Sequence, residues 1–285
     1  MKNTLLAYCR LMRLDKMIGT LLLLWPTLWA IWLTGYPTLH LVIVFILGVI
    51  FMRSAGCVIN DFADRRFDKH VERTKYRPLV NGQLTAKNAL VAFSVLIFLS
   101  LLLLSTLNYL VWLIAVFAFL TTLIYPFMKR YTHLPQIVLG IAFSWGIPMA
   151  YAATLEAFPL TCWLLFAANI AWTIAYDTQY AMVDRNDDLI IGVKSTAILF
   201  GRYDKLMIAL LDGLALLLLI WVGMINQLSI VYYLGVLCMG LCFIYQQILI
   251  YHRNRERCFK AFLNNNYAGF AIFIGIVLAT INLHQ

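Results

Sequence analysis

The sequence has little charge and few residues that break helices. Only 12% of its 285 residues are charged, and it contains 7 prolines and 15 glycines. Soluble domains are about half apolar and carry about a quarter charged residues, whereas 63% of this chain is hydrophobic and its mean hydropathy is +0.83. A soluble globular protein is therefore excluded. The long apolar runs indicate membrane-spanning helices, because lipid offers no partners for the backbone groups of an open structure.

The cysteines form no metal-binding pattern, and no targeting segment is evident. Cys238 and Cys242 are spaced i,i+4, but no histidine or further cysteine lies near them in the sequence. Buried thiols are the better interpretation. Residues 1–16 are polar and basic, and the first apolar run continues into a full span, so no cleavable signal is expected. Without a low-complexity linker or an alignable repeat, a single multi-pass membrane domain over residues 1–285 is predicted.

The fold class predicted is an all-α integral membrane protein with nine spans. Each apolar run is close to the ~20 residues that a bilayer requires. The predicted spans are 17–35, 39–60, 87–106, 108–127, 134–154, 159–183, 204–224, 228–250 and 261–282. Carboxylate-rich ends close the second and the sixth span, and this spacing suggests two four-helix halves plus a ninth helix.

Basic residues lie almost entirely on one side of this map. The loops near Tyr36, Asn108, Glu156 and Asn226 contain no lysine or arginine, and 21 of the 22 basic residues fall on or near the other side. The positive-inside rule then predicts a cytoplasmic N-terminus and a periplasmic C-terminus. The net charge of +9 therefore reflects membrane topology, and no nucleic-acid partner is expected. The absence of a transit peptide favours a bacterial inner membrane over a mitochondrial one.

A first cluster of oxygen ligands closes the second span. On a helix with about 100° per residue, Asn60, Asp61, Asp64 and Asp68 fall at about 0°, 100°, 40° and 80° and share one face. Carboxylates inside or beside a membrane are costly and suggest a site. Hard oxygen ligands suit magnesium, which proteins hold with a few carboxylates together with substrate phosphates. The alternative is a solvated helix end beside a cytoplasmic loop.

A second cluster closes the sixth span. On a helix, Asp177, Asp184 and Asp188 form a stripe at about 0°, −20° and +20°, with Asp177 about 10.5 Å deeper than Asp184. Asp187 points elsewhere and is expected in solvent. Two such stripes on one side of the membrane can bracket two magnesium ions and neutralise a diphosphate.

Basic residues surround both clusters. Tyr125 and Lys129 are spaced i,i+4 and would share a helix face. The candidates for contact with a diphosphate are Lys129, Arg130, Arg65, Arg66 and Lys194. The alternative is that these charges only set the topology.

Arg53 alone among the basic residues lies inside a predicted span. It would lie on the face of Asn60, about 10 Å deeper. A buried arginine needs an anionic partner, which is either a protein aspartate or the carboxylate of a substrate.

These motifs resemble those of the UbiA superfamily of intramembrane prenyltransferases. The first cluster fits its NDxxDxxxD pattern, the second its DxxxD pattern, and Tyr125 with Lys129 its YxxxK pattern. Longer strings extend the resemblance over essentially the whole chain and favour the branch that prenylates 4-hydroxybenzoate in ubiquinone synthesis. They are LLLLWPTLWAIW from Leu21, YPFMKRYTHLPQ from Tyr125, YDTQYAMVD from Tyr176 and GVKSTAILFG from Gly192.

The resemblance implies nine helices around a central cavity that opens laterally to membrane lipid. It implies Mg²⁺-dependent transfer of a polyprenyl group from polyprenyl diphosphate to 4-hydroxybenzoate, ortho to its hydroxyl, with release of diphosphate. It also implies roles for the motif residues. Metal ligands would come from Asp61, Asp64, Asp68, Asp177, Asp184 and Asp188, and Asp184, Asn60 and Tyr125 would act in catalysis, with Asp184 a candidate to activate the phenol. Arg53 is a further catalytic candidate because of its depth and its helix face.

Two alternatives remain open at this point. A related enzyme of the same superfamily could use a different acceptor, such as a naphthoate, a homogentisate or a haem. A cation transporter could use the aspartate stripes as ion sites, although a cation pathway is not expected to open into so dense a positive field.

Overall fold

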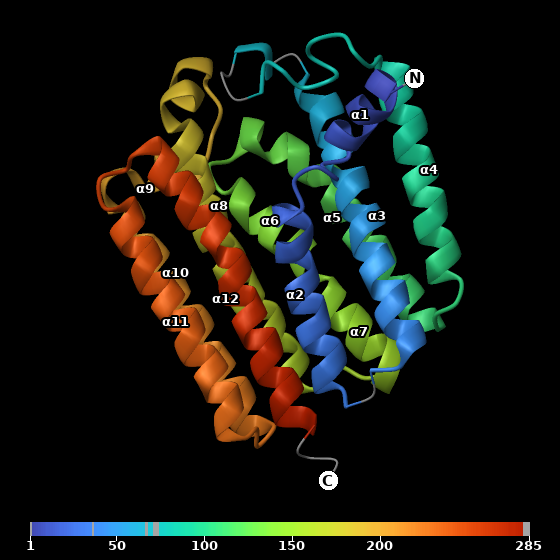
Figure 1. The fold of residues 1–285 in the computed structure, drawn as a ribbon, viewed down its shortest axis with the longest axis vertical. Helices are drawn as coiled ribbons and strands as arrows, with labels where there is room; N and C mark the ends of the chain where they lie inside the picture. Colours follow the sequence, from blue (N-terminus) through green and yellow to red (C-terminus); the bar gives the residue numbers. More distant parts are fainter. Residues whose placement is uncertain (1, 36, 66–67, 71–73, 282–285) are drawn as a thin grey trace.

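The computed structural model describes residues 2–35, 37–65, 68–70 and 74–281. Over these ranges the regular structure is helical, with no β-strand (Figure 1). The first half of the chain contains α1 (Lys2–Leu11), α2 (Ile18–Leu33), α3 (Leu39–Asp64), the 3-10 turn η1 (Asp68–His70), α4 (Ala86–Leu104) and α5 (Tyr109–Tyr131). The second half contains α6 (Pro135–Ser144), α7 (Gly146–Leu155), α8 (Leu160–Ile191), α9 (Thr196–Phe200), the 3-10 turn η2 (Gly201–Tyr203), α10 (Asp204–Ile225), α11 (Ile230–Ile250) and α12 (Arg255–Ile281).

Local sequence explains several helix ends. The side chains of Thr38, Thr85 and Asn108 accept hydrogen bonds from backbone N–H groups in the first turns of α3, α4 and α5, which satisfies donors that the helix itself leaves unpaired. The predicted span 134–154 is divided at Trp145 into α6 and α7. Pro148 lacks the N–H that would bond the Ser144 carbonyl, so one hydrogen bond that would join α6 to α7 is missing at this break.

Every predicted span overlaps a helix, and seven helical segments are long and apolar enough to cross a membrane. Helix α2 is shorter, with 16 residues, and the total of nine spans stays a prediction. Several helices are longer than the predicted spans. Helix α5 continues through Pro126 to Tyr131, and α8 continues to Ile191, so each carries its polar motif on an uninterrupted helix.

Helix α8 is central to the bundle and packs against α10, α6 and α12. Buried amides connect it to its neighbours. The side chain of Gln179 donates to Gln246 on α11 at 2.9 Å and accepts from Asn265 on α12 at 3.0 Å. Asn265 in turn accepts a hydrogen bond from the indole of Trp172 at 2.8 Å. Because buried polar groups need partners, this network fixes the rotation of α8 and therefore the direction of its aspartate stripe.

A buried carboxylate ties the ends of α8, α10 and α11 together. Asp204 is fully buried and pairs with Arg185 at 3.2 Å and with Arg253 at 2.6 Å. The hydrogen bond to Asp204 is the main cause that raises the pKa of the Arg253 guanidinium above its usual value.

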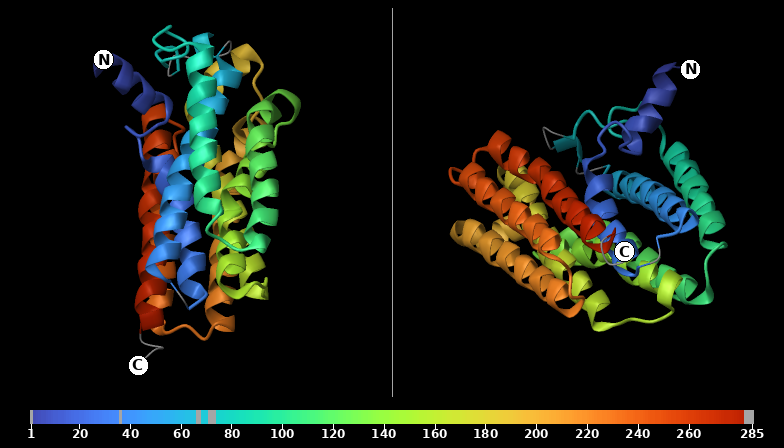
Figure 2. Two further views of the ribbon diagram at one scale, coloured as in Figure 1. Left: turned by 90° about the vertical axis from the view of Figure 1, so that its right-hand side faces the viewer. Right: turned by 60° about the horizontal axis from the view of Figure 1, so that its bottom comes forward.

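The described ends of the chain lie at opposite ends of the bundle, and the ends of α3 and α8 that carry the aspartates lie at the end of the N-terminus (Figure 1). Helix α4 lies at one edge of the bundle and α10 and α11 lie at the opposite edge, as the two views of Figure 2 also show. The orientation of the bundle across a membrane stays a prediction.

Candidate active site

The two aspartate clusters line one cavity of about 170 Å³ at the end of the bundle that carries the N-terminus. We call it the acidic cavity. Its walls come from α3, η1, α5, the start of α6, α8 and the loop that follows α8. The candidate residues that line it are Asn60, Asp64, Asp68, Tyr125, Lys129, Asp177, Asp184, Asp188 and Lys194. Residues 120 positions apart in sequence therefore form one site with carboxylates on two sides.

The prediction that the first cluster occupies one face of one helix is wrong for Asp68. Helix α3 ends at Asp64 with Arg65 as its C-cap, and Asp68 begins the separate turn η1. Asp68 still reaches the acidic cavity, where its carboxylate accepts a hydrogen bond from Arg77 at 2.7 Å. The Thr74 hydroxyl donates to the Asp68 carbonyl at 2.9 Å and holds this turn in place.

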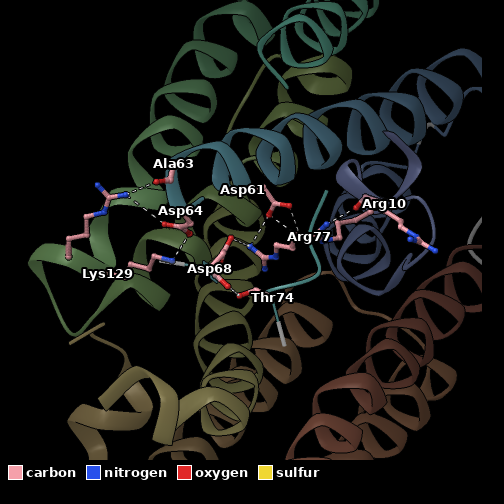
Figure 3. A network of polar contacts seen from close by, with 10 residues as sticks. Arg10, Asp61, Ala63, Asp64, Asp68, Thr74, Arg77 and Lys129 are labelled. Carbon is pink, nitrogen blue, oxygen red and sulfur yellow. Dashed lines mark hydrogen bonds and ion pairs between the residues drawn. The ribbon is translucent and has the colours of Figure 1, made fainter. Parts of the chain in front are cut away.

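Asp61 faces away from the acidic cavity. Both of its oxygens accept hydrogen bonds from Arg13, at 2.9 and 3.0 Å, and one of them also lies 2.9 Å from Arg77 (Figure 3). Asn60 and Asp64 lie within about 40° of each other on the helix, whereas Asp61 is rotated further, which explains why only the first two line the cavity. Asp61 instead holds the segment after α1 and the Arg77 loop against α3.

Asp64 is buried at the junction of α3 and α5. One oxygen accepts a hydrogen bond from the Lys129 ammonium (Figure 3). The other is buried without a hydrogen-bond partner among the described residues, and the guanidinium of Arg130 lies 3.8 Å from it. A buried carboxylate oxygen that lacks a hydrogen bond is poised to accept a cation or a donor.

The other basic candidates lie in different surroundings. Arg65 is turned back onto its own helix, where it donates to the Phe62 carbonyl at 2.6 Å and covers the Phe62 ring. Arg130 donates to the Ala63 carbonyl at 2.9 Å and does not line the cavity. Lys194 lines it, and the Lys194 ammonium donates to the Tyr131 carbonyl at 3.2 Å. Arg66 lies outside the described residues.

The second cluster lies as its spacing predicts, on one stripe of α8. Asp177, Asp184 and Asp188 all line the acidic cavity, and Asp184 is buried. Asp187 does point away from the cavity. The sequence led us to expect Asp187 in solvent, but it pairs with Arg255 at 3.1 Å. The pair forms because α12 begins next to this turn of α8.

Arg53 lies below the acidic cavity, within electrostatic reach of Tyr125, Tyr176 and Tyr180. Two of these tyrosines, Tyr125 and Tyr180, line the cavity. The guanidinium packs over the Phe143 ring at 5.4 Å, and its Nε is buried without a hydrogen-bond partner among the described residues.

None of the ion pairs within the described part of the chain involves Arg53. Of its two expected partners, a protein aspartate is therefore not observed.

Five polar residues of the cavity wall were not among the sequence candidates. They are Thr74, Arg77, Gln136, Tyr180 and Ser195. The side chain of Gln136 accepts a hydrogen bond from the Thr196 backbone N–H at 3.1 Å, and the Thr178 and Thr196 hydroxyls lie 2.7 Å apart. These contacts hold the loop after α8 against α6. Gln136, Tyr180 and Ser195 lie inside the strings that carry the resemblance, so polar residues within those strings were the available signal for them, whereas Thr74 and Arg77 lie outside the strings.

The carboxylates do not form a preformed metal centre. Within the described ranges, no three histidine, cysteine, aspartate or glutamate side chains are close enough together to hold a metal ion. The hard oxygen donors of the acidic cavity, among them the Asp64 oxygen that accepts no hydrogen bond from the described residues, still suit magnesium, which usually keeps several waters and takes one or two carboxylates plus substrate phosphates. A bound diphosphate would supply the missing oxygens.

Comparison with known proteins decides the family. The chain matches the UbiA prenyltransferase family over residues 23–275. The chain belongs to this family. Among curated proteins, 4-hydroxybenzoate octaprenyltransferase of Edwardsiella ictaluri is 61% identical over 276 residues, which cover 96% of each chain. The enzyme of the same name from Citrobacter koseri is 58% identical over 280 residues, covering 98% of this chain and 97% of the relative.

Solved structures show the same fold. The apo structure of a UbiA homologue from Aeropyrum pernix K1 has a TM-score of 0.82 at 25% identity, and the match covers 92% of this chain and 98% of that one. A UbiA homologue from Archaeoglobus fulgidus bound to GPP and Mg²⁺ has a TM-score of 0.72 at 17% identity, covering 94% and 99%. The expected resemblance to UbiA prenyltransferases is thus confirmed, and the protein is an all-α integral membrane prenyltransferase.

Proposed function

We propose that the protein transfers a polyprenyl group from polyprenyl diphosphate to the ring carbon ortho to the hydroxyl of 4-hydroxybenzoate, with Mg²⁺ as cofactor. Bacterial relatives at 56–61% identity over nearly the full length carry the name 4-hydroxybenzoate octaprenyltransferase. The archaeal homologue with the same fold was solved with a prenyl diphosphate and Mg²⁺. The same relatives support a place in a bacterial inner membrane. The distribution of basic residues supports a cytoplasmic position for the acidic cavity.

One observation carries the proposal: the aspartates of α3, η1 and α8 converge on a cavity that also contains cations. Lys129 and Arg77 line its walls next to Asp64 and Asp68. A diphosphate needs both kinds of group, because its oxygens bind cations directly and bind carboxylates only through a metal. A site for a bare metal would not require the lysine, and a site for a bare anion would not require the aspartates.

The residues divide into those that hold the leaving group and those that hold the acceptor. Asp64, Asp68, Asp184 and Asp188 would hold magnesium, with Asp177 deeper on the same stripe, whereas Asp61 is committed to Arg13 and Arg77. Bound magnesium would supply Lewis-acid stabilisation of the negative charge that develops on the departing diphosphate. Lys129 and Lys194 add positive charge at the same place, where preorganised electrostatics contribute most to the rate.

The acceptor would lie between the acidic cavity and Arg53. Its carboxylate would pair with the Arg53 guanidinium, and its hydroxyl would point toward Asn60 and Asp184. As the allylic carbon loses the diphosphate, the ring carbon ortho to the hydroxyl forms the new carbon–carbon bond. Asp184 would accept the phenolic proton and so activate the ring. The ring carbon would then lose its own proton to the released diphosphate, which restores the aromatic ring, and Asp184 would return its proton to the phenolate oxygen. Tyr125 forms the wall between the two substrates.

A panel of acceptors tests the proposal directly. Purified protein in detergent is incubated with one prenyl diphosphate, Mg²⁺ and in turn 4-hydroxybenzoate, a dihydroxynaphthoate and homogentisate, and diphosphate release and prenylated product are measured together. We expect turnover with 4-hydroxybenzoate only, lost on chelation of the metal and in Asp64→Asn. Turnover with another acceptor alone would assign the protein to a different branch of the family, and no turnover with any acceptor would refute the proposal.

A further inference from the structure

A second hollow, which shares no lining residue with the acidic cavity, is lined by α10 and α11. These two helices form one edge of the bundle (Figure 2). This α10–α11 groove has a volume of about 540 Å³, within the range of small-molecule sites. Its walls are apolar, and exposed side chains such as Ile220, Leu237 and Ile244 form its rim. Because these residues face outward from helices that can span a membrane, the groove opens toward lipid.

Two polar groups without partners line this apolar groove. Asp212 on α10 is only 3% exposed, and neither of its carboxylate oxygens has a hydrogen-bond partner among the described residues. The side-chain Nε2 of Gln247 on α11 is likewise buried and unpaired. A buried polar group without a hydrogen bond lowers stability, and an ionisable residue inside a membrane span is a candidate for function. The mechanism proposed above uses neither residue.

The two unpaired groups are complementary to one hydroxyl. Such a group can donate its proton to an oxygen of Asp212 and accept a hydrogen bond from the amide of Gln247. Space for it exists beside Asp212, because a Cβ added to Gly213 would meet no atom within 4 Å. Phe243 lies one helical turn from Gln247 and also lines the groove, so an aromatic ring that carries the hydroxyl would contact another ring.

The depth of Asp212 selects against a phospholipid headgroup. Asp204 marks the end of α10 and pairs there with Arg185 and Arg253. Asp212 lies eight residues further along the helix, which is about 12 Å deeper. Beyond it, the groove continues past Leu216 to Ile220 with apolar walls that fit a hydrocarbon chain. The occupant therefore combines a hydroxyl at this depth with a long apolar tail.

We propose that the α10–α11 groove binds a prenylated phenol, with the hydroxyl between Asp212 and Gln247 and the chain along α10 toward Ile220. The choice of a phenol rests on the proposed function, because a prenylated phenol is the chemical class that the acidic cavity releases into the membrane. The groove is then a second site, which holds a product of this class or a compound derived from it outside the catalytic centre.

Photoaffinity labelling tests the proposal on the full chain in lipid nanodiscs. The probe is a phenol with an ortho geranylgeranyl chain that carries a diazirine, and its O-methyl ether is the matched compound without the donor. Labelling is carried out without any prenyl diphosphate, and labelled peptides are identified by mass spectrometry. We expect the phenol to label α10 and α11, and the ether to label them at least about threefold less, the scale of one hydrogen bond.

Two pairs of variants locate the interaction. Asp212→Leu removes the carboxyl group and Gly213→Phe fills the groove, and both should lower phenol labelling of α10 and α11 by at least about threefold. Leu214→Phe is the control, because Leu214 is exposed and outside the groove. Retained turnover of the variants shows that they fold. Asp212→Leu should also raise the thermal stability of the ligand-free protein, because it removes an unpaired buried polar group.

The outcomes separate this proposal from the proposed function. Equal labelling by phenol and ether, or labelling confined to the acidic cavity, would each overturn the proposed phenol site. Neither of these results changes the acceptor panel, which measures turnover in the acidic cavity. Conversely, a failed acceptor panel with selective phenol labelling of α10 and α11 would refute the proposed function and retain the groove as a phenol site.

Discussion

Arg53 provides the sharpest test of how the acceptor lies in the site. We expect Arg53→Ala to raise the KM for 4-hydroxybenzoate by at least about tenfold, which corresponds to about 1.4 kcal/mol. The KM for the prenyl diphosphate should change much less. Removing one partner of a desolvated charge pair costs about 2–5 kcal/mol. The lower end applies here because the Arg53 side chain is only half-buried, with its Nε inside the protein. Arg53→Lys should recover part of the loss, since an ammonium lacks the planar fork that binds a carboxylate.

The packing of Arg53 offers a second perturbation that keeps the charge. A Cβ added to Gly19 would lie 2.4 Å from the Nη2 and 2.7 Å from the Nε of Arg53, so Gly19→Ala must displace the guanidinium. We expect the same selective rise in the KM for 4-hydroxybenzoate, smaller than in Arg53→Ala. Gly48→Ala is the matched control, because an added Cβ there meets no atom within 4 Å.

The assay compares two acceptors under saturating prenyl diphosphate and Mg²⁺. Steady-state rates are measured with 4-hydroxybenzoate and with 4-hydroxybenzamide, which has no negative charge. If Arg53 binds the carboxylate, the variants lose much less against the amide than against the acid. Equal impairment with both acceptors would refute that role. A rise confined to the KM for the prenyl diphosphate would instead assign Arg53 to the diphosphate and reverse the proposed orientation of the acceptor.

Three further predictions concern the metal site, the topology and the stability of the bundle. Asp184→Asn should nearly abolish diphosphate release and mimic chelation of Mg²⁺, whereas Asp187→Asn, on the same helix but paired outside the cavity, should retain diphosphate release. Loss of activity in both variants would mean that lining the acidic cavity does not determine which aspartates of α8 are needed for activity. In a cysteine-free background, Glu156→Cys should react with an impermeant thiol reagent from the periplasm and His252→Cys only from the cytoplasm, and labelling of both from one side would break the predicted topology. Asp204→Asn should lower the free energy of unfolding by roughly 2–3 kcal/mol, less than the ~3–5 of a fully buried pair because its arginines are partly exposed; thermal melts in detergent measure this, and an unchanged melting temperature would contradict it.

The sequence predicted the helices and the α8 stripe well for a physical reason. Apolar runs in lipid have to form helices, and a stripe on one uninterrupted helix follows from 3.6 residues per turn. Asp177, Asp184 and Asp188 satisfy that condition because α8 continues to Ile191. The first cluster does not, since α3 ends at Asp64 and the chain reaches Asp68 through a change of direction. Helical periodicity cannot predict where a side chain lies once the chain has passed the last residue of the helix.

Contacts between segments that are distant in the sequence could not be predicted from the sequence alone. Nothing in the spacing of Asp61 shows that Arg13 binds it from 48 residues away, or that Gly19 approaches the Arg53 guanidinium. Asp212 gave a partial signal, as an acid in the interior of the predicted span 204–224, which is unusual in a membrane. Its importance depends on the absence of a partner among the described residues, and only the packing of α10 against its neighbours shows that.

The pairing of Lys129 with Asp64 limits what a simple substitution can prove about the diphosphate site. Asp64 is buried, and Lys129 holds one of its two oxygens. Substituting Lys129 would remove a cation from the cavity and would also deprive the buried carboxylate of its hydrogen-bond donor, which is costly in itself. A loss of activity in such a variant would therefore not distinguish a lysine that binds diphosphate from one that only orients Asp64. Comparisons within one element avoid this ambiguity. Asp184 and Asp187 share a helix, and Gly19→Ala moves Arg53 without removing its charge, so each isolates a single interaction at the site.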